Sequence, residues 1–266
     1  MPDLLLTDHA PDAAGLVHRV TPQSAGWTYV GFDTYRLQPG QRVAAETGDI
    51  EACLVILGGK ATIAAGGETY AAIGERADVF SGRPWSVYVP WKTGYGIEAV
   101  TACEVAVCTA PGGGDHAPRL IRPEDCGTMT RGSGTNTRHV CDILPETKPA
   151  HSLLVVEVIT PSGCWSSYPS HKHDTDNFPD ETRLEEIYFH KLNPPQGFAF
   201  QRVYTDDKAL DVTMCIHDGD LVMVPYGYHP CGTAHGYDLY YLNVMAGPKR
   251  MWRVNTRACH RWLLPK

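Results

Sequence analysis

The chain has 266 residues, of which 43% are hydrophobic and 20% charged, as in ordinary soluble globular proteins. A net charge of −7 argues against a nucleic-acid partner, because phosphate binding needs a basic surface. No apolar segment approaches the ~18–20 residues of a membrane span, "MPDLLLTDHAPDAAG" lacks the basic start of a signal peptide, and the nine cysteines are scattered without a C-x-x-C pair. We therefore expect a cytoplasmic protein with reduced thiols and no membrane partner.

Short strand-like runs recur from one end of the chain to the other. They are rich in Val, Ile, Tyr and Phe, and Gly, Pro, Asp or Asn bounds them. Long amphipathic helices are absent from the pattern: "RPEDCGTM" has room for one turn, and "TPQSAGW" is expected to be a loop. This pattern predicts an all-β sandwich or barrel protein. The runs are, in chain order, "ACLVILGG", "WSVYVP", "CEVAVCTA", "SLLVVEVIT", "EEIYFHKL", "GFAFQRVYT", "DLVMVP" and "DLYYLNVMAG".

The chain divides into two halves that echo each other weakly. The segment 111–140 is rich in Gly, Thr and Arg, so we interpret it as a connector between the halves 1–110 and 141–266. In each half an acidic residue, Glu51 or Glu186, opens a strand-like run that follows a turn. The first half lacks the histidines of the second. We expect two copies of one β-barrel, with the chemistry in the C-terminal copy.

The stretch "YPSHKHDTDNFPDETRLEEIYFHKLNP" contains the residues most typical of a metal site. In a strand, His171 and His173 point to the same face, with Cα atoms about 6.5–7 Å apart. Glu186 offers a carboxylate, and strand parity favours it over Glu185. His229, after the Pro-x-Gly turn of "VPYGYHPCG", is the expected fourth ligand. Three imidazoles and a carboxylate with open positions suit a catalytic Zn, Mn, Fe or Co ion.

These residues resemble the two metal motifs of the cupin superfamily. Gly163, His171, His173 and Glu186 form the first, and Gly219, Pro225, Gly227 and His229 form the second. The match departs from the common pattern in two places: "DTDNFPDETRLE" lengthens the gap before Glu186, and one residue is missing between Gly227 and His229. Longer segments are similar to the 5-deoxy-glucuronate isomerases of bacterial myo-inositol breakdown. These segments are "SHKHD", "LEEIYFHKLNPPQGFAFQRVYTDD", "DGDLVMVPYGYHP" and "GYDLYYLNVMAGPKRMW" in the second half, and "ACLVILGGKATI", "GERADVFSGRP" and "AVCTAP" in the first.

The resemblance implies a bicupin of two jelly-roll-like barrels, of which the N-terminal one is degenerate and binds no metal. It implies an aldose–ketose isomerase that converts 5-deoxy-D-glucuronate to 5-dehydro-2-deoxy-D-gluconate in the cytoplasm. One divalent ion, zinc or manganese, is the expected cofactor, and the small deoxy-uronate is the expected partner. The sequence leaves the oligomeric state open, with a homo-oligomer as one option.

Such an isomerisation moves a proton from C2 to C1, and a divalent ion stabilises the charge that develops on the oxygens. His190 shares a strand face with Glu186 and is one candidate for the base. Tyr188 and Tyr241 are candidates for a proton relay, although strand tyrosines are more often core residues. A hydride shift would need no base, and the sequence does not choose between the two routes.

The carboxylate of a uronate should meet a cation. Arg202, Arg183, Lys172 and Arg138 are the options, and we favour Arg202 because an unpaired charge in an apolar strand would be costly. The alternative for Arg202 is a structural ion pair. Gln201 points to the opposite face, so only one of these two neighbours lines the pocket. Lys172 alternates away from the histidines and is expected to face outward.

Two rival functions fit the same motifs. A cupin dioxygenase would use iron at the same ligands, and it would consume O₂ where an isomerase would not. A non-catalytic sugar-binding bicupin would retain the fold, but such proteins often lose the ligands that this chain keeps.

Overall fold

The structure is a computed structural model that describes residues 3–264, and nearly all of its regular elements are β-strands. The helical elements are α1 (Pro22–Ala25) and the short 3-10 turns η1 (Pro123–Asp125), η2 (Gly134–Asn136) and η3 (Ala258–Leu263). Within the described range, no helix is long and apolar enough to span a bilayer. The predicted all-β class is confirmed, and each strand-like run named above contains a strand.

The helix α1 corrects the expectation that "TPQSAGW" is a loop. Thr21 is its N-cap: the Thr21 hydroxyl accepts the Ser24 N–H at 3.1 Å, and the Ser24 hydroxyl accepts the Thr21 N–H at 2.9 Å. Pro22 occupies the first helical position, and Gly26 ends the helix with a φ of 70°. These are ordinary start and stop signals, but they enclose too few residues to show a helical period. The turn expected in "RPEDCGTM" is present as η1.

The chain divides into two compact units. The N-terminal unit comprises residues 9–127 and 141–156, and the C-terminal unit comprises the described residues of 1–8, 128–140 and 157–266. The predicted division at 110 and 140 differs from these units. The expected connector contributes β11 (Arg119–Ile121), β12 (Gly127–Arg131) and the start of β13 (Arg138–Leu144), because its short apolar and Thr-rich runs find hydrogen-bonding partners in the sheets.

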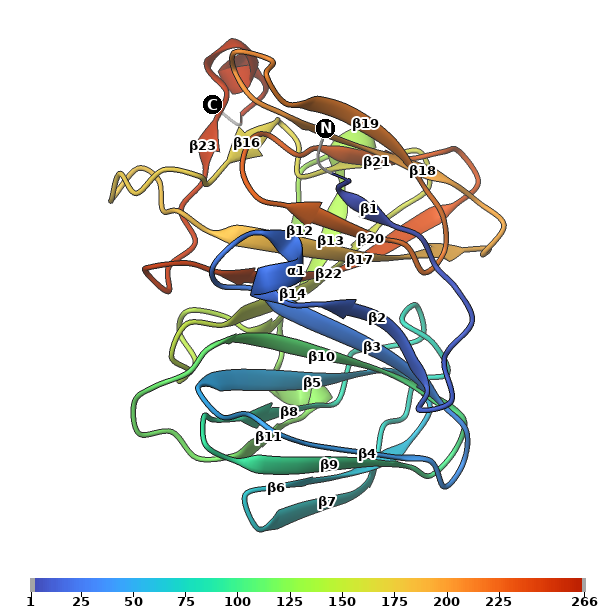
Figure 1. Cartoon of the computed structure of the whole chain (residues 1–266). Coiled ribbons are helices and arrows are strands. Elements are labelled where there is room, and N and C mark those ends of the chain that lie inside the picture. The colour runs from blue at the N-terminus through green and yellow to red at the C-terminus, as the bar shows by residue number, and fades with distance from the viewer. Residues whose placement is uncertain (1–2, 265–266) are drawn as a thin grey trace. The chain divides into compact units, whose positions relative to one another are not determined.

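The strands that belong wholly or partly to the C-terminal unit form three sheets (Figure 1). The seven-stranded sheet has the order β1 (Leu5–Leu6), β20 (Leu221–Val224), β17 (Glu185–Asn193), β22 (Asp238–Ala246), β14 (Leu154–Thr160), β13 and β12. The four-stranded sheet has the order β15 (Trp165–Ser166), β21 (Cys231–Thr233), β18 (Ala199–Tyr204) and β19 (Asp211–Ile216). The third sheet pairs β16 (His171–Lys172) with β23 (Asn255–Thr256).

The N-terminal unit contains two further sheets. The six-stranded sheet has the order β11, β8 (Ser86–Val89), β5 (Ile50–Gly58), β10 (Cys103–Pro111), β3 (Gly31–Leu37) and β2 (Leu16–Val20). The four-stranded sheet has the order β4 (Arg42–Glu46), β9 (Gly94–Ala99), β6 (Ala61–Ala65) and β7 (Glu68–Ile73).

One face of β5 lies in the apolar core of the N-terminal unit. Ala52, Leu54 and Ile56 alternate along this face and are fully buried in one cluster with Val87 and Val89. Burying a leucine or isoleucine side chain contributes roughly 1.5–3 kcal/mol. Inward positions that could carry ligands are therefore filled by aliphatic side chains that stabilise the unit.

Strand register shows which residues of the two units correspond. Ala52 pairs with Val89, the residue before Pro90, and Glu186 pairs with Val224, the residue before Pro225. Ala52 therefore occupies the place of Glu186. The echo between Glu51 and Glu186 seen in the sequence is out of register by one residue, which places the two carboxylates on opposite faces.

Glu51 has a different role, as a buried anchor for backbone donors. Its carboxylate accepts the Tyr88 O–H at 2.5 Å and the N–H groups of His151, Ser152 and Leu153 at 2.7–2.8 Å. A buried carboxylate needs such donors to offset the loss of its hydration. Glu51 thus fixes the segment that leads into β14.

The corresponding strand of the C-terminal unit, β17, carries polar side chains on its inward face. It lies between β20 and β22, as Figure 1 shows. Glu186, Tyr188 and His190 alternate along it and are at most 1% exposed. Buried polar groups need partners, so this face is where a site is expected.

Candidate metal centre

Three buried side chains converge at one point in the C-terminal unit. Within residues 3–264, His173, Glu186 and His229 form the group whose ligand atoms all lie within 4.8 Å of one another. The Nε2 atoms of both histidines lie 3.1 Å from Glu186 Oε2. Ligands bound to one ion at about 2.0–2.2 Å lie about 3 Å apart when they subtend a right angle. The spacing therefore suits a shared cation.

The tautomers of the two histidines leave lone pairs directed at the carboxylate. His173 Nδ1 lies 3.1 Å from the Leu184 carbonyl oxygen, and His229 Nδ1 lies 2.8 Å from that of Gly227. A carbonyl only accepts, so each Nδ1 carries the proton and, in a neutral ring, each Nε2 is a lone-pair donor. Outer partners of this kind are usual for metal-binding histidines.

His229 Nε2 provides the test of whether a cation fits. This atom is buried and finds no hydrogen-bond partner among the described residues, although Glu186 Oε2 is close. A buried polar atom without a partner costs free energy. A divalent cation between the lone pairs of His173, His229 and Glu186 would satisfy all three, so the donor set fits a metal ion.

The charges of the group influence one another strongly. Burial raises the pKa of Glu186, but the adjacent imidazoles of His229 and His173 outweigh burial and lower this pKa to about 2. Burial lowers the pKa of His173, but the hydrogen bond and the charge of Glu186 raise it above its ordinary value. The carboxylate is therefore ionised at neutral pH, as a metal ligand must be.

His171 lies beside this group but outside it. Its ring centroid is 5.3 Å from that of His229 and 6.4 Å from that of His173. Burial and these two imidazoles hold the pKa of His171 well below its ordinary value, so the ring is neutral. Of the four predicted ligands, three meet directly. His171 as the fourth ligand stays a prediction.

Local structure explains how the three ligands meet. The His173 carbonyl accepts the Leu184 N–H at 2.8 Å, which holds the His173 segment beside the start of β17. The turn before His229 contains Gly227 at a φ of 92°, and a Cβ there would lie 2.7 Å from the Tyr204 carbonyl oxygen. Only glycine fits this close approach.

His190 is held next to the centre by Gln201. The Gln201 amide nitrogen lies 3.4 Å from the His229 carbonyl oxygen, which leaves its Oε1 3.0 Å from His190 Nε2. His190 therefore carries its proton on Nε2, and its buried Nδ1 has no partner in the described part of the chain. Burial lowers the pKa of His190 to about 4, against the opposing effect of Gln201. The ring is a neutral proton acceptor at pH 7.

Tyr188 and Tyr241 lie on the same side as His190. Their ring centroids are 4.9 Å apart, and Tyr188 stacks on His190 at 5.7 Å. The Tyr188 hydroxyl bonds to Ser167 and the Tyr241 hydroxyl to Ser166. Burial raises the pKa of both phenols well above the ordinary value, so both stay protonated.

The four predicted cations have different surroundings. Arg202, which we favoured for the substrate carboxylate, is 44% exposed and makes two 2.7 Å hydrogen bonds to Asp211. Arg202 therefore forms a structural ion pair, which was the alternative role considered for it, and the side chain of its neighbour Gln201 points inward. Arg183 is exposed.

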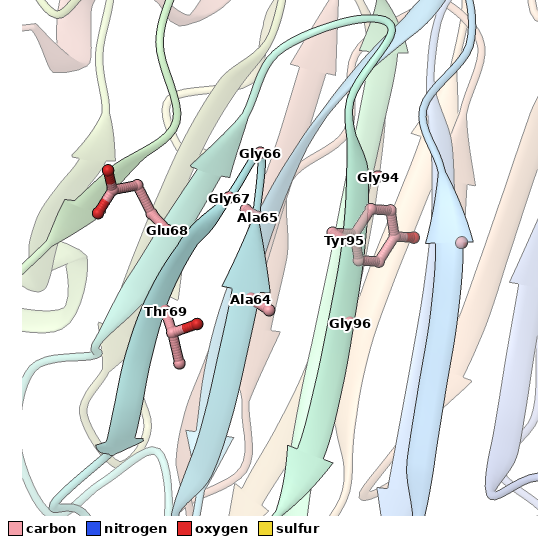
Figure 2. Close-up of a pocket in the computed structure, with 10 residues that line it drawn as sticks. Ala64, Ala65, Gly66, Gly67, Glu68, Thr69, Gly94, Tyr95 and Gly96 are labelled. Carbon is pink, nitrogen blue, oxygen red and sulfur yellow. The ribbon is translucent and has the colours of Figure 1, made fainter.

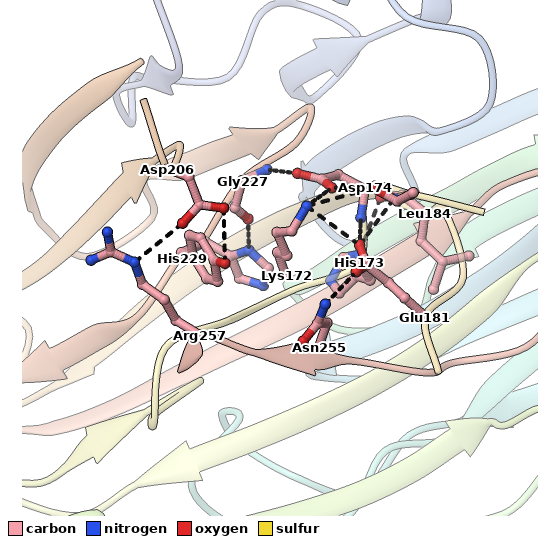
Figure 3. A network of polar contacts seen from close by, with 12 residues as sticks. Lys172, His173, Asp174, Glu181, Leu184, Asp206, Gly227, His229, Asn255 and Arg257 are labelled. Carbon is pink, nitrogen blue, oxygen red and sulfur yellow. Dashed lines mark hydrogen bonds and ion pairs between the residues drawn. The ribbon is translucent and has the colours of Figure 1, made fainter. Parts of the chain in front are cut away.

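Lys172 does not face solvent as predicted. Its side chain is only 18% exposed and pairs with Asp174 and Glu181 (Figure 3). Arg138 is partly buried, and burial lowers its pKa while the nearby phenols of Tyr241 and Tyr188 raise it.

Sequence reasoning missed Asn243. It is 2% exposed, and its Nδ2 is without a partner in the structure as described. It shares strand parity with Tyr241 on β22. A lone asparagine in the apolar run "DLYYLNVMAG" was the available signal, because burying an amide is costly.

A pocket of the N-terminal unit has no comparable chemistry (Figure 2). It lies at the turn between β6 and β7 and beside β9, and most of its lining residues are glycine or alanine. Only Glu68, Thr69 and Tyr95 contribute polar side chains. The C-terminal unit is therefore the place to look for catalysis.

Comparisons with known proteins show which family this chain resembles. A sequence profile of the KduI/IolB family matches residues 5–263. A protein named 5-deoxy-glucuronate isomerase from Geobacillus kaustophilus (strain HTA426) is 54% identical over 265 residues, covering 99% of this chain and 96% of the relative. One of the same name from Bacillus subtilis (strain 168) is 47% identical over 253 residues, covering 94% and 93%.

Two solved structures also resemble this chain. The crystal structure of an IolB-like protein from Salmonella typhimurium LT2 superposes with a TM-score of 0.96 at 47% identity, covering 98% of this chain and 99% of the other. Oxalate decarboxylase from Bacillus subtilis matches with a TM-score of 0.66 at 13% identity, covering 100% and 81%. The second likeness is one of fold alone, and it confirms the predicted bicupin class.

Proposed function

Because the chain belongs to the KduI/IolB family, we propose that it is a 5-deoxy-glucuronate isomerase that works with one divalent metal ion. The observation that carries the metal part is the convergence of His173, Glu186 and His229 on one point, with lone pairs facing one another. Relatives named 5-deoxy-glucuronate isomerase cover nearly the whole chain and support the substrate. The reaction is the conversion of 5-deoxy-D-glucuronate to 5-dehydro-2-deoxy-D-gluconate.

The metal would be held by His173, Glu186 and His229, with His171 as the fourth ligand. When bound, it supplies Lewis-acid stabilisation of the negative charge that develops on the substrate oxygens. Zinc and manganese both suit imidazole and carboxylate donors. Glu186 would contribute the negative charge of the donor set, because histidine binds a metal ion as a neutral imidazole.

His190 is the proposed proton carrier. Its Nδ1 lone pair takes the proton from C2 of the aldose, and the imidazolium, which can exchange this proton with solvent, then delivers a proton to C1. The proton of the C2 hydroxyl moves to the C1 oxygen as the carbonyl moves to C2. Gln201 Oε1 accepts the Nε2–H, so it fixes the ring and stabilises the imidazolium that forms. Tyr188 and Tyr241 stay protonated, which makes them hydrogen-bond donors rather than bases.

Arg138 is the proposed partner of the substrate carboxylate. Arg202 is engaged by Asp211 on an exposed face, whereas Arg138 is partly buried and lies near Tyr241 and Tyr188. A guanidinium matches a carboxylate with two parallel hydrogen bonds. Arg138 would thus hold the acid end of the sugar while the aldehyde end meets the metal ligands.

We also propose a cytoplasmic location and a division of labour between the barrels. None of the nine cysteines, all of which lie in the described part of the chain, is in a disulfide, and a reducing compartment would keep them as thiols. The inward face of β5 carries Ala52, Leu54 and Ile56 where β17 carries Glu186, Tyr188 and His190. This supports an N-terminal barrel that stabilises the protein and binds no metal.

Product formation from 5-deoxy-D-glucuronate under anaerobic conditions tests the proposed function. We expect the purified protein to form the ketone without oxygen, to lose this activity after chelation, and to recover it when zinc or manganese is restored. A protein that consumes oxygen, or that leaves the uronate unchanged with every divalent ion tried, is not this isomerase.

A further inference from the structure

The segment that lengthens the gap between His173 and Glu186 is tied into the fold. The backbones of Asn177 and Glu181 bond to each other in both directions, at 3.1 and 3.0 Å. The Glu181 carboxylate, 2% exposed as a residue, accepts the N–H groups of Asp174 and Thr175 at 2.9 and 3.0 Å. The segment therefore has a defined path, and it begins with Asp174 directly after His173.

Asp174 connects two stretches of chain that carry metal ligands. Its Oδ2 accepts the Gly227 N–H at 3.0 Å, and the Gly227 carbonyl accepts the His229 Nδ1–H at 2.8 Å (Figure 3). Its Oδ1 bonds to Lys172 and Thr175. One carboxylate thus links the residue after His173 to the peptide that orients His229.

The Gly227 peptide is confined from more than one side. Tyr228 and Tyr204 exchange backbone hydrogen bonds of 2.8 Å in both directions, and the Tyr204 carbonyl oxygen closes the space beside Gly227 Cα. Asp174 supplies the remaining constraint, on the Gly227 N–H.

We propose that Asp174 is a positioning residue for the metal centre, which holds His229 in its metal-binding orientation through the backbone of Gly227. This inference rests on the proposed function, because it requires that His173, Glu186 and His229 bind a metal. Asp174 touches neither the substrate nor the ion in this account. Its effect passes through the Nδ1–H hydrogen bond, which fixes the ring and raises the basicity of Nε2.

Metal affinity is the quantity that tests this role. Mn²⁺ or Zn²⁺ dissociation constants, measured by competition with a chelator, should rise about 10–100-fold in Asp174→Ala, the loss typical of removing such an outer partner. Asp174→Asn keeps an oxygen acceptor and should fall between Asp174→Ala and the unchanged protein. Asp211→Ala removes an exposed carboxylate whose partner is Arg202, and it should bind metal normally.

A spectroscopic and kinetic readout separates positioning from general stability. With Mn²⁺ bound, the electron paramagnetic resonance spectrum of Asp174→Ala should differ from that of the unchanged protein. The kcat of Asp174→Ala should be closer to that of the unchanged protein at saturating metal than at limiting metal. If Asp174→Ala does not fold, the positioning role is tested by comparing Asp174→Asn with Asp211→Asn. A several-fold loss of metal affinity is expected only in Asp174→Asn.

The measurements distinguish failure of the positioning role from failure of the proposed function. Equal metal affinity in Asp174→Asn, Asp174→Ala and the unchanged protein would overturn the positioning role and leave the proposed function standing. An unchanged protein that binds neither Mn²⁺ nor Zn²⁺ would overturn the proposed function, and the positioning role with it.

Discussion

At the scale of single residues, Glu186 carries the negative charge of the candidate metal centre. It is 1% exposed, and its partners at 3.1 Å are the Nε2 atoms of His173 and His229. Its neighbour Glu185 is also buried but points to the other face of β17. The two adjacent glutamates therefore form a natural pair for comparison.

Glu186→Gln should abolish metal binding at micromolar metal, because a neutral amide is a poor metal ligand. It should lower kcat/KM by more than the roughly 100-fold that results from losing a group that only hydrogen-bonds a metal ligand. Metal content by mass spectrometry and the isomerase assay check this. Glu185→Gln is the control and should keep its metal. Full activity in Glu186→Gln would contradict the assignment.

His190→Gln should lower kcat by about 10²–10⁴-fold, the usual contribution of a general base, while metal content stays normal. In D₂O, a proton carried by His190 exchanges with solvent, so deuterium should appear at C1 of the product. His217→Gln, a change at an exposed histidine, should have no effect. Product without deuterium would favour the hydride shift instead.

Arg138→Ala should raise KM for the uronate by roughly 10–100-fold, since a hydrogen bond to a charged group contributes about 1.5–3 kcal/mol. Arg202→Ala should leave KM near its original value, because that guanidinium is paired with Asp211. Steady-state kinetics of both variants check the assignment, and the reverse order of effects would move the carboxylate site to β18.

At the scale of elements, the turn between β20 and His229 tolerates little change at Gly227. Gly227 combines a φ of 92° with a backbone oxygen 2.7 Å from where a Cβ would lie. Gly236 has a similar φ of 94° but open space around its Cα. The two positions separate the cost of the dihedral angle from the cost of the contact.

Gly227→Ala should lower the free energy of unfolding by more than the roughly 1–2 kcal/mol of a left-handed residue, and it should weaken metal binding because the turn must move. Gly236→Ala should show only the dihedral cost and keep its metal. Thermal unfolding and chelator competition measure both. Normal metal affinity in a folded Gly227→Ala protein would show that the turn does not position His229.

At the scale of the whole molecule, the two units use the same strand positions in opposite ways. In the N-terminal unit, Ala52, Leu54 and Ile56 pack into an apolar core, and Glu51 on the other face anchors backbone donors. In the C-terminal unit the inward face of β17 is polar. One face thus contributes to an apolar core, and the other holds the side chains of the candidate metal centre.

Sequence periodicity predicted which side chains of β17 share one face, but not which side chain of β18 turns inward. A period of two residues places Glu186, Tyr188 and His190 on one face whatever the partner strands are. Whether Arg202 or Gln201 turns inward depends on the pairing of β18 with β19, which brings Asp211 diagonally across from Arg202. That register is a non-local property, so the local pattern did not reveal which side chain turns inward. The ion pair of Lys172 with Glu181 likewise depends on the path of the longer gap.

The count of tightly bound metal per chain, measured together with activity, tests the central claim most directly. Stripped protein titrated with Zn²⁺ or Mn²⁺ should regain isomerase activity in proportion to bound metal and reach its maximum at one ion per chain, since one barrel offers ligands and the other offers aliphatic side chains. Full activity in protein that holds no metal would contradict the account.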